Sequence, residues 1–203
     1  AGVDDEWLYE ARVRAWPARA VRVEAYSRRE DFYENAATVD AGLYRRTHGA
    51  LVHVQPSDNW HVQAWAQLSD LADGNDREEA GGEFQWKILQ EPRRLTLTYR
   101  AEYYAFAEGD PVYFSPGNFW TQRIQLDWRH QLGAHELFWG SRRTYYDLGY
   151  GYGWDKSGEP GHTFRAAAHH DVNERLSLHL EGRATVGDVY DAYTGQCWLE
   201  WRF

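Results

Sequence analysis

The chain has 203 residues and a formal net charge of −9, so it is long enough for one domain and lacks the basic excess of nucleic-acid-binding proteins. Its mean hydropathy is −0.76, and no stretch approaches the roughly 18 consecutive apolar residues of a membrane helix. The single cysteine, Cys197, excludes an internal disulfide framework. A membrane barrel stays possible, because its strands alternate lipid-facing and lumen-facing residues and so average to a polar composition.

Five tight turns recur at a spacing of roughly 40 residues, and Pro, Gly, Asn and Asp supply their turn chemistry. They are predicted at Trp16–Arg19, Pro56–Asn59, Glu91–Arg94, Leu132–His135 and Asp171–Glu174. Longer polar or Gly-rich loops are predicted between them, at Ser27–Ala37, Asp70–Gly82, Glu108–Asn118, Trp154–Gly161 and Gly187–Asp191. Short turns at one end of the strands and long loops at the other are the layout of an outer-membrane barrel.

Apolar and polar residues alternate with a period of two between turns and loops, as strands with one apolar and one polar face require. The pattern is clearest over residues 60–68, 95–103, 120–129, 176–184 and 193–203. A helix would spread these apolar residues around its circumference. The segments run about 10–14 residues, which suits a tilted crossing of the hydrocarbon layer better than a soluble sandwich.

The alternation is less clear in two places. Apolar residues stand at odd positions over 39–43 and at even positions over 50–54, which predicts a β-bulge near His48–Gly49. Over Glu136–Thr144 both faces are mixed.

About eleven strands are counted, whereas a single-chain bacterial barrel has an even number. Either the chain is part of a larger barrel, or residues 7–26 form one long strand with Pro17 at a bulge. The fit of the Pro17 turn to the repeat favours the larger barrel. No signal peptide is visible, so Ala1 either follows a cleaved leader or continues a longer protein.

Aromatic residues, 16% of the chain, gather at the two ends of these segments. Near the short turns they are Trp16, Trp60, Trp128, Trp201 and Phe203. Near the loops they are Tyr103, Tyr104, Phe106, Tyr113, Phe114, Phe119, Trp120, Tyr145, Tyr146, Tyr150, Tyr152, Tyr190 and Tyr193. Any one of them could simply fill a core, but together they form the double girdle of a membrane barrel. The sequence therefore predicts an all-β, antiparallel up-and-down transmembrane β-barrel in a bacterial outer membrane, as one domain over residues 1–203.

Charged residues crowd the face opposite the apolar one. The cationic candidates are Arg12, Arg14, Arg22, Arg46, Lys87, Arg100, Arg123, Arg129, Arg142, Arg165, Arg183 and Arg202, and the anionic ones are Glu10, Glu24, Asp40, Glu83, Glu102, Asp127, Asp171, Glu181 and Glu200. Each cationic side chain would cost about 2–4 kcal/mol at mid-membrane depth, so this face is expected to point into the barrel. It either fills a closed, ion-paired interior or lines a wet channel. The mixed signs suit a neutral or zwitterionic cargo.

Two aromatic and nine charged residues are expected to line the lumen and bind a cargo. They are Trp65, Trp198, Arg100, Glu102, Arg123, Asp127, Arg129, Glu181, Arg183, Glu200 and Arg202. Aromatic rings can stack on the apolar faces of sugars while charged groups bind hydroxyls. Tyr44, Tyr104 and Tyr146 are further candidates. Ordinary filling of the lumen is the alternative for each.

Catalytic and metal-binding patterns are weak. The run His169-His170-Asp171 could be a ligand or dyad cluster, but it lies beside a predicted turn, where adjacent side chains point to opposite faces. No phosphate loop, nucleophile elbow or metal-ligand spacing is present. The acidic loops at residues 30–31, 73–79 and 108–110 could bind calcium, although solvation accounts for them as well. We therefore expect no enzyme activity, no metal and no cofactor.

Three stretches resemble a known family. They are Asp110–Phe119 with the alternating strand that ends Asp127-Trp128-Arg129, Tyr145–Gly153, and Tyr190–Tyr193 followed by Trp198–Phe203. Over about the last 100 residues the chain resembles the C-terminal β-barrels of the tetratricopeptide-linked porins that export cellulose or poly-N-acetylglucosamine. The resemblance implies a barrel of about 16 strands that passes a polysaccharide from periplasm to exterior. The chain departs from the family in lacking the helical repeats and several strands.

The sequence thus predicts an outer-membrane polysaccharide channel, with outer-membrane lipid as its surroundings. A periplasmic helical-repeat domain or export-complex subunits are the further partners that the resemblance implies. Three alternatives remain open: a general porin or structural barrel, a soluble five-bladed β-propeller that binds sugars, and an outer-membrane hydrolase.

Overall fold

The structure is a computed structural model, and it describes residues 7–33, 36–40, 42–90, 92–132, 144–187 and 191–202. These residues contain eleven strands and one short helix, α1 (Ala36–Asp40). The strands are β1 (Tyr9–Ala18), β2 (Val21–Asp31), β3 (Tyr44–Ser57), β4 (Trp60–Leu71), β5 (Asp76–Leu89), β6 (Arg93–Phe106), β7 (Phe119–Leu132), β8 (Thr144–Asp155), β9 (Pro160–Asp171), β10 (Leu176–Gly187) and β11 (Asp191–Trp201).

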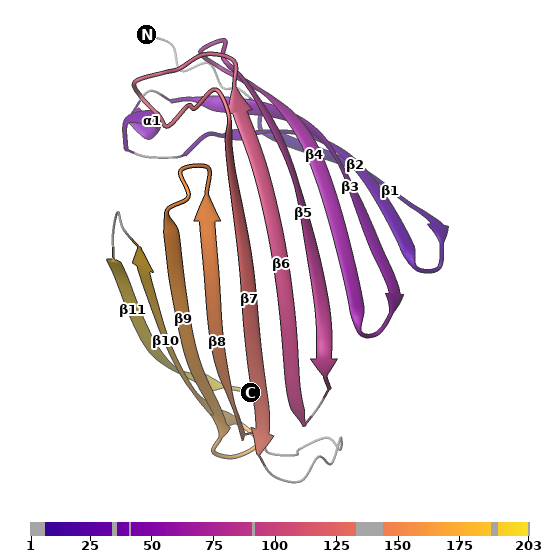
Figure 1. Cartoon of the computed structure of the whole chain (residues 1–203), viewed down its shortest axis with the longest axis vertical. Coiled ribbons are helices and arrows are strands. Elements are labelled where there is room, and N and C mark those ends of the chain that lie inside the picture. Colours follow the sequence, from indigo (N-terminus) through magenta and orange to yellow (C-terminus); the bar gives the residue numbers. More distant parts are fainter. Residues whose placement is uncertain are drawn as a thin grey trace. The chain divides into compact units, whose positions relative to one another are not determined.

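All eleven strands belong to one antiparallel sheet in which each strand pairs with the next one along the chain (Figure 1). The up-and-down order confirms the predicted fold class and strand number. A propeller is wrong, because its strands would be divided among separate blades. Every described residue of β1 and β11, the first and last strands of this order, is exposed.

The chain divides into two compact units that share the middle strands. Unit 1 comprises Ala1–Ser57, His61–Phe84 and Ala101–Thr121, and unit 2 comprises Asp58–Trp60, Gln85–Arg100 and Gln122–Phe203. Within unit 1, residues 19–20 form a short turn and residues 107–118 form a longer connection. Within unit 2, residues 156–159 and 172–175 are equally short connections, so the long loop predicted at Trp154–Gly161 is wrong.

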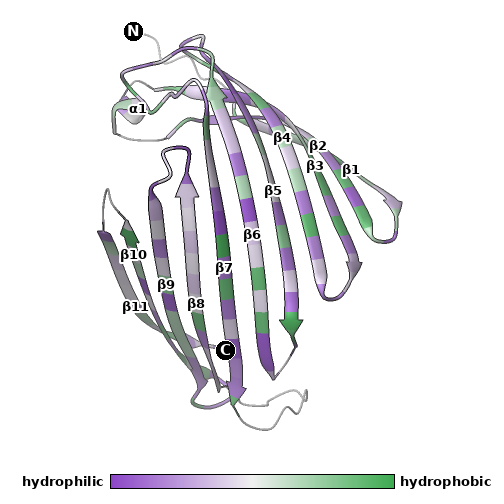
Figure 2. Ribbon diagram, viewed as in Figure 1, coloured by the Kyte–Doolittle hydropathy of each residue, from purple (hydrophilic) through white to green (hydrophobic). Residues whose placement is uncertain are grey.

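Each strand has an exposed apolar face and a more covered polar face, and Figure 2 shows the resulting bands along the strands. In β4, the exposed side chains include Val62 and Leu68, the latter 63% exposed, while Gln63 and Gln67 between them are half-buried. In β8, Leu148 and Tyr150 are exposed at 45% and 42%. This is the reverse of a water-soluble protein, which buries its apolar side chains. The predicted orientation of the two faces is therefore confirmed.

Glycines on the polar face leave room for side chains from the preceding strand. A Cβ on Gly81 would lie 2.3 Å from the indole of Trp65, so that ring lies across β5. Tyr26 likewise crosses Gly49, its partner in the β2–β3 ladder, and its hydroxyl donates to Gln67 Oε1 at 2.6 Å. The glycines thus let large side chains lie flat along the polar face.

The structure corrects two predictions about the strands. Residues 70–82 are not a long loop, because β5 begins at Asp76 and only residues 72–75 connect it to β4. The β2–β3 ladder runs without a shift past His48–Gly49, so no bulge lies there; residues 39–43 simply precede the strand. The register shift lies instead between Ala15 and Ala18 in β1, where Pro17 cannot donate a backbone hydrogen bond.

The predicted girdles are confirmed in part. At the short-turn end, Trp60 stacks on Trp86, a residue that the sequence pattern did not assign, with ring centroids 5.4 Å apart. The prediction that Tyr145 and Tyr146 lie at the loop end is wrong, because they begin β8 on the short-turn side. The predicted turn at Leu132–His135 and the mixed stretch Glu136–Thr144 fall almost wholly outside the described residues, as do Tyr190 and Phe203.

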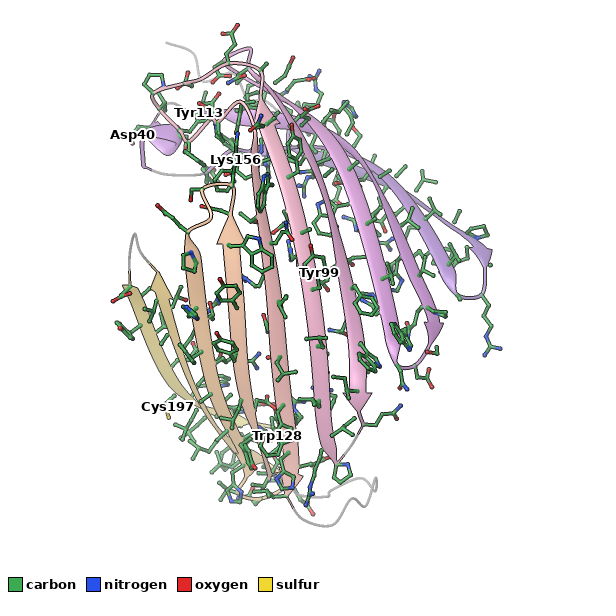
Figure 3. The ribbon with its side chains drawn as sticks, in the orientation of Figure 1. Asp40, Tyr99, Tyr113, Trp128, Lys156 and Cys197 are labelled. Atoms are coloured by element: carbon green, nitrogen blue, oxygen red, sulfur yellow. The ribbon has the colours of Figure 1, made fainter. Side chains whose placement is uncertain are left out.

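The buried apolar cluster of unit 1 lies among its loops. Phe32, Leu71, Phe106 and Tyr113 are each at most 5% exposed and pack together. Figure 3 shows Tyr113 in the loop that follows β6. This loop, residues 107–118, is therefore anchored by a small core of its own.

A buried asparagine fastens the same loop. Asn75 Nδ2 donates to the Glu108 carbonyl at 2.8 Å, and the Glu108 amide donates back to Asn75 Oδ1 at 3.0 Å. The Tyr113 hydroxyl donates to Asp73 at 2.9 Å. Burial raises the pKa of Tyr113 to about 12, so the phenol stays a neutral donor at physiological pH.

We expect Gly81→Ala to destabilise the sheet by about 1–3 kcal/mol, because the added methyl group displaces the Trp65 indole. Urea unfolding in detergent, followed by tryptophan fluorescence, measures this. The control is Gly82→Ala, where a Cβ would meet only the Gln63 carbonyl at an ordinary 3.6 Å. Equal stability of the two variants would contradict the placement of Trp65.

We expect Asn75→Ala to release the loop, because it removes both hydrogen bonds between the Asn75 side chain and the Glu108 backbone, at a cost of about 1–3 kcal/mol. Limited chymotrypsin digestion should then cleave within residues 107–118 at least about tenfold faster than in the unmodified chain. Asn118→Ala, a change at an exposed position of the same loop, should not accelerate cleavage.

Candidate functional site

The polar face of unit 2 contains a cavity of about 270 Å³ between side chains of β5 to β9. It is lined by Gln85, Lys87, Arg94, Thr96, Asp127, Trp128, Arg129, Asp147 and Arg165. Figure 3 places Trp128 near the end of β7 that leads toward the short-turn side. Four cationic side chains and two carboxylates therefore meet in one polar hollow.

Asp147 orders the arginines of this cavity. Arg129 binds it with two hydrogen bonds, Nε to Oδ1 at 2.6 Å and Nη2 to Oδ2 at 2.7 Å. Arg165 reaches the same carboxylate at 3.6 Å and Glu181 of β10 at 3.7 Å. Because the guanidinium is planar, the two-point contact fixes the orientation of Arg129 as well as its distance.

Asp127, the second carboxylate, lies over a glycine. A Cβ on Gly149 would come within 2.7 Å of Asp127 Oδ1, so the carboxylate occupies the space that a side chain on β8 would take. Gln125 Nε2 donates to Asp127 Oδ2 at 2.7 Å. The β8 glycines Gly149, Gly151 and Gly153 thus leave this part of the polar face free of side chains of their own.

A row of four rings crosses β8 to β11 at one level of the ladder. Tyr145 pairs with His169, His169 with His179, and His179 with Trp198. Tyr145 stacks on His169 with centroids 4.8 Å apart, and His179 stacks on Trp198 at the same separation. Arg129 lies over the Tyr145 ring at 4.3 Å, which joins this row to the cavity.

Beside this row, His169 Nε2 and Ser177 Oγ both contact Asp171 Oδ1, at 2.9 and 2.6 Å. The serine thus donates to the carboxylate, whereas nucleophilic catalysis requires that it donate to the histidine. His170 points to the other face and contacts Thr144 Oγ1 at 2.8 Å. The run His169-His170-Asp171 is therefore split between the two faces as the turn position predicts.

On the polar face of unit 1, arginines and glutamates form ion pairs. Glu24 is 5% exposed and accepts from Arg14 Nε at 2.7 Å, with Arg12 at 2.9 Å. Arg45 reaches Glu30 at 2.7 Å. This part of the face is thus cross-linked from β1 to β3.

The structure brings some predicted lumen residues together and separates others. Asp127 and Arg129 line the cavity, and Glu181 adjoins it through Arg165. Trp198 belongs to the row of rings, and beyond it Arg202 binds Glu200 at 3.0 Å. The remaining predicted residues lie along the polar face of their strands: Trp65 and Glu102 in unit 1, and Arg100, Arg123 and Arg183 in unit 2.

The structure also corrects the predicted face of several side chains. Arg45, whose side chain reaches Glu30, takes the place expected for Arg46, which is exposed on the apolar side. Tyr145 lies on the polar face and Tyr146 on the other, where it contacts Trp128 and His130. Tyr44 also faces away from the polar side, while Tyr104 lies on it beside Arg77. Asp40 belongs to α1 instead of a strand, and Arg142 is outside the described residues.

Sequence reasoning missed Arg94 and Asp147 as cavity residues. Arg94 was expected in a turn, but β6 already begins at Arg93. Asp147 could have been found from the alternation of Tyr145, Asp147 and Gly149 with Tyr146 and Leu148.

Among the described residues, no helix is long and apolar enough to cross a membrane. In the same part of the chain, His, Cys, Asp and Glu side chains do not gather in threes that could hold a metal ion.

Comparison with known proteins gives one informative likeness. No family model and no curated protein matches the sequence. A solved structure described as a bacterial polysaccharide outer membrane secretin superimposes with a TM-score of 0.67. The alignment covers 96% of this chain and 69% of that one at 17% sequence identity. At this identity the likeness establishes a shared fold: this chain has the strand architecture of that outer-membrane protein.

Proposed function

We propose that the chain is an outer-membrane channel that passes a polysaccharide from the periplasm to the cell exterior. The observation that carries the proposal is the pairing of an exposed apolar face with a polar face that is hollowed by a cavity. Lipid would cover the first, and hydrated cargo would move along the second. The likeness to a polysaccharide outer membrane secretin supports this choice of cargo.

The chemistry of the polar face suits weak, successive binding of sugars. Asp127, Gln85 and Thr96 line the cavity and offer oxygen and nitrogen partners for hydroxyl groups. Conduction requires sites that bind a cargo without trapping it, and a small number of hydrogen-bonding side chains would provide such a site. The transport is passive, with no bond made or broken.

A periplasmic helical-repeat domain or further export subunits are the proposed partners of the channel, because the export porins that the sequence resembles carry such repeats. The Asn75-bound loop would lie at the exterior end, where long loops of such barrels are found.

Membrane placement predicts that two neighbouring alanines respond oppositely to the same substitution. Ala166 is exposed beside Leu148 on the apolar face. Ala166→Arg should therefore make the free energy of folding in lipid less favourable by about 2–4 kcal/mol. Ala167 lies on the polar face between Asp147 and Glu181 in the ladder, so Ala167→Arg should fold normally. The fraction of heat-modifiable band after refolding into vesicles measures both. A tolerated Ala166→Arg would contradict burial of this face in lipid.

The channel itself is tested by planar-bilayer conductance of the full chain. We expect stepwise single-channel currents that added oligosaccharide reduces, because the cargo occupies the ion path. Insertion without current would overturn the channel in favour of a closed, ion-paired structural barrel. Current that no oligosaccharide changes would favour a general porin.

A further inference from the structure

The sign of charge in the unit 2 cavity differs from that of the whole chain. The chain carries −9 overall, yet four cationic side chains and two carboxylates line the cavity. Opposite charges that are paired leave little net attraction, so the question is which groups in the cavity already have partners.

The carboxylates have partners. Asp147 accepts two hydrogen bonds from Arg129 and has Arg165 at 3.6 Å. Asp127 accepts from the neutral amide of Gln125. The charge of Asp147 is thus taken up mainly by Arg129, and Arg165 receives only the longer contact.

Two cationic groups have unused donors. Of the described residues, none is a hydrogen-bond or ion-pair partner of the half-buried Lys87 side chain. Arg165 Nε is buried and makes no hydrogen bond within the described part of the chain; its contact to Glu181 spans 3.7 Å. Donors of a partly buried cation that make no hydrogen bond are costly, and an anion in the cavity would relieve that cost for Lys87 and for Arg165 Nε.

From this excess of cationic groups with unused donors we infer that the cavity binds the anionic group of an acidic sugar, with Lys87 and Arg165 as its cationic contacts. The hydroxyls of the same sugar would meet Asp127, Gln85 and Thr96, which line the same wall. The inference rests on the proposed function, since it names the polysaccharide that this channel would pass: one that carries acidic units along its length. It replaces the neutral or zwitterionic cargo that the mixed charges of the sequence suggested.

Binding to the full chain in detergent micelles tests the inference, with a galacturonic acid hexamer as the acidic probe and cellohexaose as the neutral one. We expect the acidic hexamer to bind at least about tenfold more tightly than cellohexaose, and binding to weaken as salt screens the cations. Lys87→Gln should lower the affinity for the acidic hexamer at least about fivefold and leave the affinity for cellohexaose unchanged. Titration calorimetry measures all of these.

The matched control is Lys156→Gln, which removes the chain's other lysine from the exposed β8–β9 loop and should change neither affinity. Equal affinity of the unmodified chain for the two hexamers, or equal effects of the two lysine variants, would overturn the inference. The salt dependence of the unmodified chain decides the matter if Lys87→Gln does not fold. Channels that conduct without preferring the acidic hexamer would refute this site alone, whereas acidic binding without conductance would refute the channel alone.

Discussion

The two faces of each described strand require different surroundings, because one face is apolar and the other carries polar and charged side chains. Side chains such as Leu68, Leu148 and Leu199 are exposed, and at about 25 cal/mol per Å² an apolar surface of this extent is tolerable only against lipid or another apolar body. The opposite face carries charges that lipid would reject. A period of two residues meets both demands, and it is the reason that the described residues form strands with only one short helix.

Because the apolar face is exposed, side chains pack against one another mainly on the polar face. There, glycines and charged residues make the contacts that a hydrophobic core makes in a soluble protein. Gly81 admits Trp65, Gly149 admits Asp127, and Asp147 holds two arginines in place. These same contacts leave Lys87 and Arg165 incompletely neutralised in the cavity of unit 2. The candidate site is therefore a product of how strands pack their polar sides, and its chemistry follows from the same registers that hold the sheet together.

The fold could be predicted from the sequence because strict alternation over ten or more residues fits an extended strand and does not fit a helix. The prediction failed where the alternation of apolar and polar residues could not be recognised in the sequence. Polar residues 73–79 look like a loop, although Arg77 and Glu79 are polar-face residues at the start of β5. Apolar residues before β3 suggested a bulge that the ladder does not contain.

The cavity could be predicted only in part. Asp127 and Arg129 share a strand, so their common face follows from alternation alone. Lys87, Asp147 and Arg165 come from three other strands. Which residues of neighbouring strands meet at one level depends on register, and the pattern within a single strand does not give the register.

The complete exposure of β1 and β11 has a consequence for assembly. Each bounding strand has one hydrogen-bonded neighbour among the described residues, which leaves a row of amide and carbonyl groups along its outer side. In hydrocarbon each such group would cost several kcal/mol. For a chain that enters a bilayer as proposed, water satisfies these groups only until the sheet leaves it. Pairing of both margins with further backbone and entry into the bilayer would then have to occur together.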